Sequence, residues 1–293
     1  MPFRIRLVIL VVVLLGGAFL VVPAARALSI SPVKGVVTVE PGGASRVAVT
    51  ITNTDPASAQ FSLFGVALRQ DSEGHTLRGA PGDEAAQWAV PDTNLFVLES
   101  GSKRTVFFTV TVPAGTSAGS RLVGLVARQQ SLSEGGTAVT AELATVLSVQ
   151  VAGIVTENLS FTATRLTPGI TWKKNWQFQL DLKNTGSVEL TLEGSAELRS
   201  FAGAVLAQEK IYLGNQLFPG VSRSLSQSIT GQNIGYWPAR YRVVSRVRYG
   251  KTGQEVFSEN TIWYVPRTLL IWLSATLVLA LSPALFLRRK KLP

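Results

Sequence analysis

Val49-Thr50-Ile51-Thr52-Asn53-Thr54 alternates apolar with polar residues and ends in Asn-Thr, and Leu180-Asp181-Leu182-Lys183-Asn184-Thr185 repeats this pattern 131 residues later. Strict alternation places one face of a β-strand against a core and the other face in water. The two segments therefore predict the same strand in two copies of one domain.

Two further matches extend the repeat along the chain. Leu98-Glu99-Ser100-Gly101 resembles Leu217-Phe218-Pro219-Gly220, and Gly119-Ser120-Arg121-Leu122 resembles Pro238-Ala239-Arg240-Tyr241, both at an offset of 119 residues. The offset falls by 12 residues after the first match, so the first copy carries an insertion. The polar, turn-rich residues 69–94 are its expected place, with the projecting loop near 70–94.

Alternating segments separated by turns continue through both halves of the chain. Val106, Phe108, Val110 and Val112 alternate with threonines, and turn signals such as Pro41-Gly42-Gly43 and Asn184-Thr185-Gly186 lie between the strands. Short strands bounded by such turns are typical of antiparallel sandwiches. We therefore expect an all-β fold of two tandem immunoglobulin-like antiparallel sandwiches, residues 28–153 and 154–266. Trp172 and Trp176 share the apolar face of one strand and are expected in the second core.

The positive charge is concentrated at the two ends of the chain. The formal net charge is +10, but eight of the 28 basic residues precede residue 28 or follow residue 266. The residues between carry 20 basic against 18 acidic side chains, so no nucleic-acid partner is expected.

Both ends have the pattern of targeting segments. Residues 1–27 combine a basic head, an apolar run and Ala25-Arg26-Ala27, which predicts a secretory signal peptide, with an uncleaved anchor as the alternative. The 20 uncharged residues from Thr268 to Leu287 predict a transmembrane helix in contact with the lipid bilayer. The basic tail 288–293 follows, and the positive-inside rule then predicts a single-pass type I protein of the cell membrane with an extracellular ectodomain.

Residues suited to catalysis are scarce. The chain has no Cys and one His, which argues against a structural zinc site, and no metal or cofactor is expected. Gly115-Thr116-Ser117-Ala118-Gly119 matches the nucleophile-elbow pattern, but a strand and not a helix is predicted to follow it. We therefore expect no enzymatic activity and interpret Ser117 as a turn residue.

Two sets of residues are candidates for ligand binding. Asp71, Glu73 and His75 lie in the insertion, where they form either a binding or acid–base site or a solvated loop tip. The second set consists of four cations on one face of a predicted strand: Arg240, Arg242, Arg246 and Arg248. This stripe fits either an anionic partner or the solvated face of an antiparallel strand.

The start of the first domain resembles the WxL-interacting protein family. The resemblance rests on residues 28–41, on the turn Gly42-Gly43-Ala44 with the strand into Asn53-Thr54, and on Pro113-Ala114-Gly115 before the Gly-rich strand 119–126. It implies a peptidoglycan-binding first domain and a second domain that engages protein partners or host surfaces. Residues 69–94 depart from the family pattern.

Three functions follow as expectations. The first is a membrane-anchored cell-surface adhesion or scaffold protein that binds a cell-wall polymer or a surface protein, with the insertion as the ligand site. The alternative is a chaperone-like sandwich that assists surface-protein assembly by strand pairing. The enzymatic alternative is a surface hydrolase that uses the loop of Asp71, Glu73 and His75, or Ser117.

Overall fold

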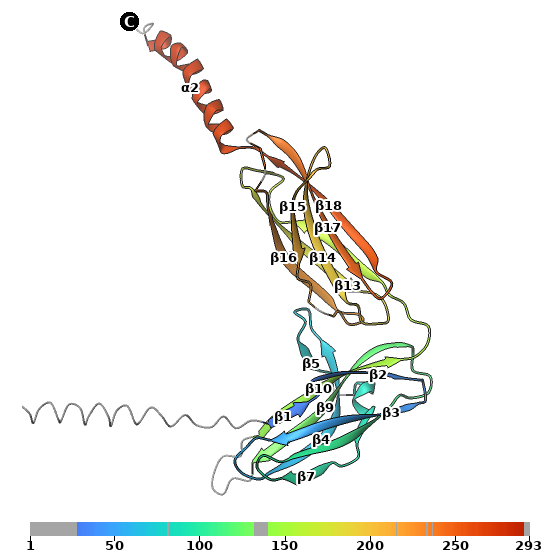
Figure 1. Ribbon diagram of the computed structural model, residues 1–293. Coiled ribbons are helices and arrows are strands. Elements are labelled where there is room, and N and C mark those ends of the chain that lie inside the picture. The colour runs from blue at the N-terminus through green and yellow to red at the C-terminus, as the bar shows by residue number, and fades with distance from the viewer. Residues whose placement is uncertain are drawn as a thin grey trace, which may run out of the picture.

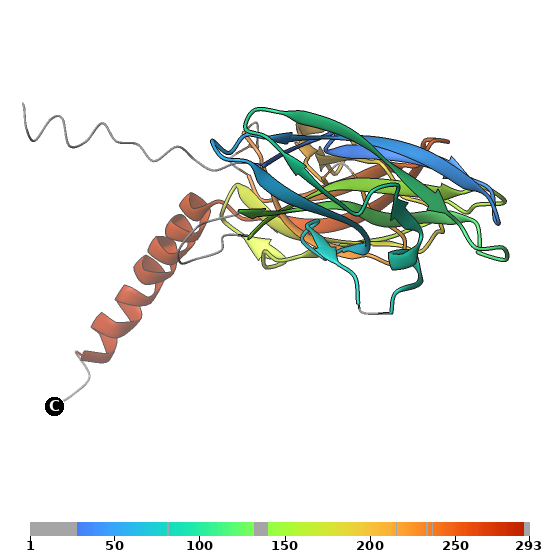
Figure 2. The same cartoon turned by 90° about the horizontal axis from the view of Figure 1, so that it is seen from below.

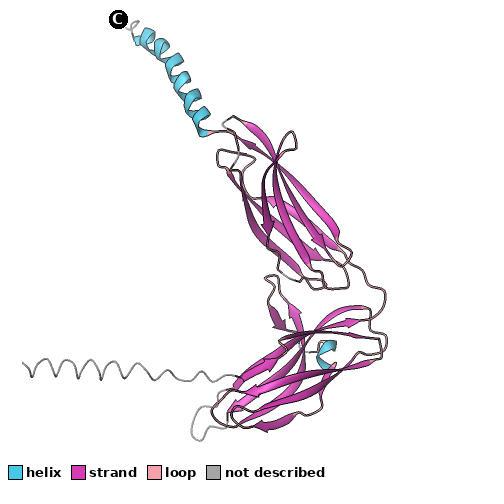
Figure 3. Cartoon of the chain, viewed as in Figure 1, coloured by secondary structure: helices cyan, strands magenta, loops and turns pink. Residues whose placement is uncertain are grey.

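The computed structural model describes residues 28–80, 82–131, 140–214, 216–232, 234–235 and 237–289, without the side chains of 131 and 280–289. Strands dominate the described chain, and they form two sandwiches set at an angle to each other (Figures 1 and 3). The predicted signal peptide, residues 1–27, lies outside the described residues, as does the end of the basic tail from 290 to 293.

The first sandwich is built from two sheets. One sheet has the order β1-β3-β8-β6, with β1 at Leu28–Ser31, β3 at Ala44–Asn53, β8 at Lys103–Thr111 and β6 at Ala89–Pro91. The other has the order β2-β10-β9-β4-β5, with β2 at Lys34–Val39, β10 at Thr140–Val151, β9 at Gly119–Ser131, β4 at Ala59–Gln70 and β5 at Thr76–Arg78. Strand β7, Leu95–Leu98, pairs with β4, and the 3-10 helix η1 covers Glu84–Gln87.

The second sandwich repeats this plan with fewer strands. Its smaller sheet has the order β11-β13-β16, with β11 at Leu159–Arg165, β13 at Asn175–Asn184 and β16 at Ser222–Thr230. Its larger sheet has the order β12-β18-β17-β14-β15, with β12 at Ile170–Thr171, β18 at Gln254–Tyr264, β17 at Ala239–Tyr249, β14 at Leu192–Ser200 and β15 at Val205–Ile211.

Each sandwich encloses its own apolar core, as the alternation predicts. The first core includes Phe61 and Phe108 from opposite sheets, and the second is centred on Trp176, which is 1% exposed. Trp172 differs from the prediction because it lies just beyond β12, 49% exposed, with the Arg267 guanidinium over its ring.

Both sandwiches contain one parallel pair, which the antiparallel prediction did not include. Strand β2 runs parallel to β10 and β12 runs parallel to β18. The cause is a change of sheet by the first strand of each domain: β1 pairs with β3 in one sheet, and β2 then joins the other sheet. The second domain does the same with β11 and β12.

The repeated asparagine makes equivalent hydrogen bonds in both domains, with one additional acceptor for Asn53. The Asn53 side chain donates to the carbonyls of Leu98, Ala57 and Glu99, and its oxygen accepts from the N–H of Asp55. Asn184 donates to Leu217 and Val188 and accepts from Gly186. Both asparagines are fully buried, so each fixes the end of its strand to the turn that follows.

The helix α2, Arg267–Arg289, projects from the far end of the second sandwich (Figures 1 and 2). Across the part of the chain that the structure describes, no helix is both long and apolar enough for a membrane crossing. The prediction of a transmembrane helix from Thr268 to Leu287 is therefore wrong, and so is the single-pass type I placement that depends on it.

Candidate functional site: the elbow between the sandwiches and the open edge of β10

The predicted ligand loop is a hairpin that reaches the second sandwich. Strands β4 and β5 extend beyond the body of the first sandwich toward the second (Figure 1). At the end of β4, the Gln70 side chain donates to the carbonyl of Gln216 at 3.2 Å and accepts from the N–H of Phe218 at 3.2 Å. A primary amide can satisfy a donor and an acceptor at once, so Gln70 joins the two domains as a short strand would.

Asp71, Glu73 and His75 form the tip of this hairpin. Asp71 accepts from the N–H groups of Glu73 and His75 at 2.9 and 2.8 Å, and its other oxygen lies 3.2 Å from His75 Nδ1. Burial raises the pKa of Asp71, but the hydrogen bonds from His75 and Glu73 outweigh it and hold the pKa below its ordinary value. The structure thus brings the three predicted residues together, with Asp71 fixing the turn.

No metal centre is formed at this tip. Among the described residues there is no group of three or more His, Asp and Glu side chains placed to hold a metal ion. His75 is exposed and contacts the two carboxylates of its own turn.

A buried arginine receives the tip of the hairpin. Arg223 on β16 is 5% exposed and donates to the carbonyls of Leu213 and Gln216. Burial lowers the pKa of Arg223, and the charge of Asp71 acts in the opposite direction. A Cβ atom built on Gly74 would lie 2.8 Å from the guanidinium, and one on Gly214 would also collide with it. The guanidinium is thus held between the glycines of two domains.

A second polar contact lies beside the linker. Glu189 of the second sandwich accepts from Ser148 at 2.9 Å and from Gln150 at 3.4 Å on β10. Its N–H donates to the Ser120 hydroxyl, and the N–H of Ser120 donates to the carbonyl of Ser187. Together with the hairpin contact, this gives the junction between the two sandwiches, here called the elbow, two separate attachment points.

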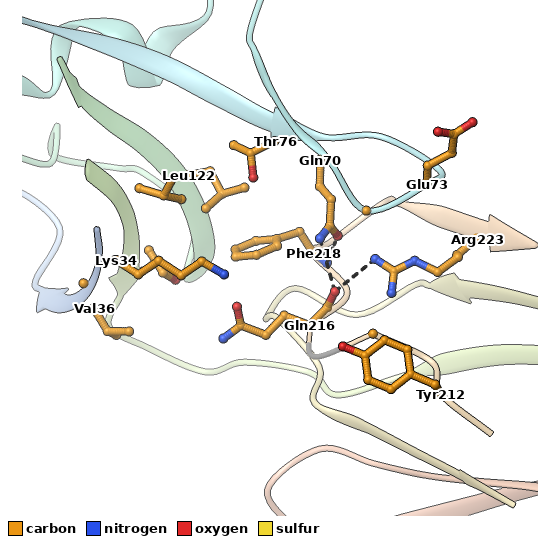
Figure 4. Close-up of a pocket in the computed structure, with 15 residues that line it drawn as sticks. Lys34, Val36, Gln70, Glu73, Thr76, Leu122, Tyr212, Gln216, Phe218 and Arg223 are labelled. Atoms are coloured by element: carbon orange, nitrogen blue, oxygen red, sulfur yellow. Dashed lines mark hydrogen bonds between the residues drawn. The ribbon is translucent and has the colours of Figure 1, made fainter. Parts of the chain in front are cut away.

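A hollow of about 380 Å³ lies between the two sandwiches. Figure 4 shows Lys34 of β2 extending into it from one side and Tyr212 and Gln216 facing it from the other. Phe218 and Leu122 supply apolar walls, while Glu73 at the hairpin tip points away. The hollow combines apolar walls with the ammonium group of Lys34.

The arginine stripe of β17 is largely neutralised by its neighbour β18. Arg242 lies 3.2 Å from Glu259 and Arg246 lies 3.9 Å from Glu255, on the same outer face of the sheet. Arg240 stacks on the ring of Phe201 at 4.6 Å. Arg248 has no carboxylate within ion-pairing distance among the described residues. The predicted stripe exists as a face, but it is a mixed-charge face.

Ser117 lies in an exposed turn and accepts from Arg121 at 3.2 Å. The strand β9 follows it directly, so the strand-to-helix context of a nucleophile elbow is missing here.

The last strand of the first sandwich has one half of its outer edge open. Residues 146–151 of β10 are covered by β2, from Val146 opposite Lys34 to Val151 opposite Val39. Residues 140–145 pair with β9, and no described strand pairs with their other side. The N–H of Val146 donates outward to Val33, so alternation also directs the N–H groups of Thr140, Glu142 and Ala144 outward.

Sequence reasoning missed the residues that build the elbow. Gln70, Arg223 and Glu189 each contact partners that are distant in sequence, and none belongs to a recognisable motif. The only usable signal was the insertion itself, whose 12 extra residues indicated that the first domain has an additional element. Its role as an interdomain contact could not be deduced from its polarity.

Comparison with known proteins yields structural similarity only. No family model and no curated protein matches the sequence. Similar structures include a chain of a chaperone–tip adhesin complex of CFA/I fimbriae, with 11% identity, 82% of this chain and 99% of that chain covered, and a TM-score of 0.43. The class 5 fimbriae chaperone CfaA has 10% identity, coverage of 82% and 100%, and a TM-score of 0.42. The E. coli chaperone DraB has 11% identity, 81% of this chain and 97% of that chain are covered, and the TM-score is 0.42.

These structures are fimbrial chaperones, whereas the sequence pattern resembles the WxL-interacting protein family, and that resemblance stays a prediction. We therefore base the function on the chain's own geometry.

Proposed function

We propose that this protein assists other surface proteins in a chaperone-like manner, by pairing one of their extended segments with the open half of β10. The observation that carries the proposal is the half-covered edge itself: β2 covers residues 146–151, and no strand in the described part of the chain pairs with residues 140–145 on that side. An exposed edge of this kind is a template for an added strand, which gains main-chain hydrogen bonds.

The side chains of this edge also suit an added strand. Leu143 faces the core side of β10, as Leu147 and Val149 do, but it is 38% exposed while those two are buried. A partner strand beside it would bury this apolar surface with its own alternate side chains. Glu142 on the opposite face is held by Arg78 and Arg128, so its charge is neutralised.

The edge ends at the hollow between the domains. The incoming chain of Pro32 and Val33 meets β10 at Thr145 and Val146, and Lys34 follows at the rim of the hollow. A strand added along residues 140–145 would therefore have its end directed toward Lys34. Some of the similar structures are chaperones in complexes with an adhesin or a pilin, but the proposal rests on the edge of β10.

The experiment compares two proline variants of the full chain. Ala144→Pro removes an outward N–H on β10, and Phe257→Pro removes an outward N–H on β18, the corresponding edge of the second sandwich. Edge positions tolerate proline because this N–H makes no ladder hydrogen bond. Both variants should keep the wild-type circular dichroism spectrum and melting curve.

Binding is then followed by hydrogen exchange with the secreted surface proteins of the same cells. We expect the amides of Thr140, Glu142 and Ala144 to become protected in the wild type and in Phe257→Pro. In Ala144→Pro the association should weaken at least tenfold. Undiminished binding by Ala144→Pro, or a complex that leaves these amides unprotected, would show that the edge of β10 is not the binding site.

A further inference from the structure

A second hollow adjoins the one between the domains. It has a volume of about 590 Å³ and lies on the outer face of the larger sheet of the second sandwich, over β14, β15 and β17. Tyr212 and Gly214 line both hollows, so the two are neighbouring parts of one groove. The groove runs from Lys34 in the first sandwich past Tyr212 to Arg248 in the second.

Tyr212 is the most exposed tyrosine that the structure describes in this groove. Its ring is 78% exposed, although the second core is close enough to bury the neighbouring Ile211 and Leu213. Figure 4 shows its hydroxyl directed into the first hollow. An aromatic ring in this position stabilises the folded chain little, but it provides a flat platform for a ligand.

The groove carries an excess of unpaired positive charge. Lys34, Lys210 and Arg248 have no carboxylate within 4.0 Å in the described ranges. Among the acidic lining residues Glu255 pairs with Arg246, Glu73 lies beside the His75 ring, which is charged only when protonated, and Glu193 has no ion pair among the described residues. Three free cations against two carboxylates, Glu73 and Glu193, favour an anionic ligand.

We propose that this groove binds an anionic carbohydrate chain. A sugar ring would lie against Tyr212, and acidic groups on neighbouring units would lie near Lys34 on one side and near Lys210 and Arg248 on the other. The side-chain amides of Gln216 and Gln208 line the two hollows, and each can donate to and accept from hydroxyl groups.

The groove suits a carbohydrate better than an acidic peptide. Its floor on β14 and β17 is the face of a sheet in which both strands are paired on both sides, so a peptide backbone would find few free main-chain partners there. Hydroxyl groups need side-chain donors and acceptors, which this surface supplies. The groove meets the proposed strand-pairing edge at Lys34, but Tyr212, Lys210 and Arg248 belong to the second sandwich and lie apart from residues 140–145 of β10.

The test measures binding of the full chain to three probes of similar length by isothermal titration calorimetry. The probes are an oligogalacturonate, which carries one carboxylate per sugar, a neutral dextran oligomer, and an oligoglutamate. We expect the oligogalacturonate to bind best, with an affinity that falls as salt rises. Equal binding of oligoglutamate would indicate an acidic-peptide site instead, and equal binding of dextran would rule out the role of the three cations.

Variants then locate the site. Tyr212→Ala and the double variant Lys210→Gln with Arg248→Gln should each weaken oligogalacturonate binding at least tenfold. The matched controls are Trp237→Ala, which removes another exposed ring, and Lys251→Gln, which removes an exposed cation; both lie outside the groove and should leave binding unchanged. Unchanged binding in Tyr212→Ala would overturn the proposal.

Discussion

In the first sandwich β2 covers six residues of the last strand β10, whereas in the second sandwich β12 covers only two residues of the last strand β18. The second edge is nevertheless the better protected one. Arg165 of β11 donates to the carbonyl of Thr261 at 2.6 Å, and Asn260 donates to the carbonyl of Ala163 at 2.8 Å. Glu255 and Glu259 flank the exposed Phe257 on the remaining stretch.

Charged side chains on an edge strand discourage further pairing. The open half of β10 carries a single charged residue, Glu142, which pairs with two arginines of its own sheet, Arg78 and Arg128. The edge of β18 carries two glutamates, Glu255 and Glu259, and each of them pairs with only one arginine of β17. The length of the uncovered edge therefore does not decide whether a strand can be added to β10 or to β18. What decides is whether side chains protect the uncovered main-chain groups.

The largest expected effect on stability comes from the buried asparagine that each sandwich contains, Asn53 in the first and Asn184 in the second. Asn53→Ala removes the hydrogen bonds to three carbonyls and one N–H, and Asn184→Ala removes those to two carbonyls and one N–H. The carbonyls of Glu99 and Leu217 and the N–H of Gly186 keep backbone partners. We expect losses of about 3 kcal/mol or more in the unfolding free energy of the affected domain, with the larger loss for Asn53→Ala. Urea denaturation of the full chain measures both.

Asn175→Ala is the matched control, because this asparagine is exposed at the start of β13 and its change should cost less than about 0.5 kcal/mol. Equal, small effects of all three substitutions would contradict the equivalence of the two buried asparagines.

The next effect concerns the elbow. Arg223→Met removes hydrogen bonds to Leu213 and to Gln216, whose carbonyl also accepts from Gln70 of the first sandwich, and it removes the charge that faces Asp71. We expect a cost of about 1–3 kcal/mol. Small-angle X-ray scattering should show a wider range of interdomain angles. His75→Ala is the control, since His75 contacts only its own hairpin turn and should leave the scattering unchanged.

A smaller effect tests the protection of β18. Replacing Glu255 and Glu259 together by Thr removes both charges from the edge and favours strand formation. We expect concentration-dependent self-association in sedimentation velocity, with the fold intact. If the double variant stays monomeric at the highest soluble concentration, the glutamates do not protect this edge.

The smallest effect is a dependence on pH. The backbone N–H of Lys251 and the Thr252 hydroxyl hydrogen bond to Glu157 and hold its pKa below the ordinary value. A carboxylate with a lowered folded-state pKa contributes stability at neutral pH, which is lost as the pH falls below about 4.5. Glu157→Gln should therefore destabilise the second sandwich slightly at pH 7. This difference should shrink as the pH falls below 4.5, as followed by thermal melts over that range.

The strands and the repeat were predictable because they depend on local alternation and on a buried asparagine. Val106, Phe108 and Val110 are buried as their spacing predicts, and Asn53 and Asn184 make equivalent buried hydrogen bonds. The parallel pairs were not predictable, since a strand that changes sheets alternates like any other. Gln70 contacts residues 146 and 148 positions away, and such contacts leave no periodic trace in the sequence. The arginine stripe was predictable, but its neutralisation by Glu255 and Glu259 depends on strand register.

The guanidinium of Arg223 between Gly74 and Gly214 has an evolutionary consequence. The angle of the elbow depends on a few polar contacts at the ends of two domains, and neither apolar core takes part in them. A substitution at Gly74, where φ is +93°, would strain the hairpin turn and bring a Cβ within 2.8 Å of the guanidinium, and it would therefore shift the hairpin tip while leaving both apolar cores intact. Descendants of such a chain could thus change the shape they present to a partner by one mutation at a time, while both sandwiches stay under their own separate selection for stability.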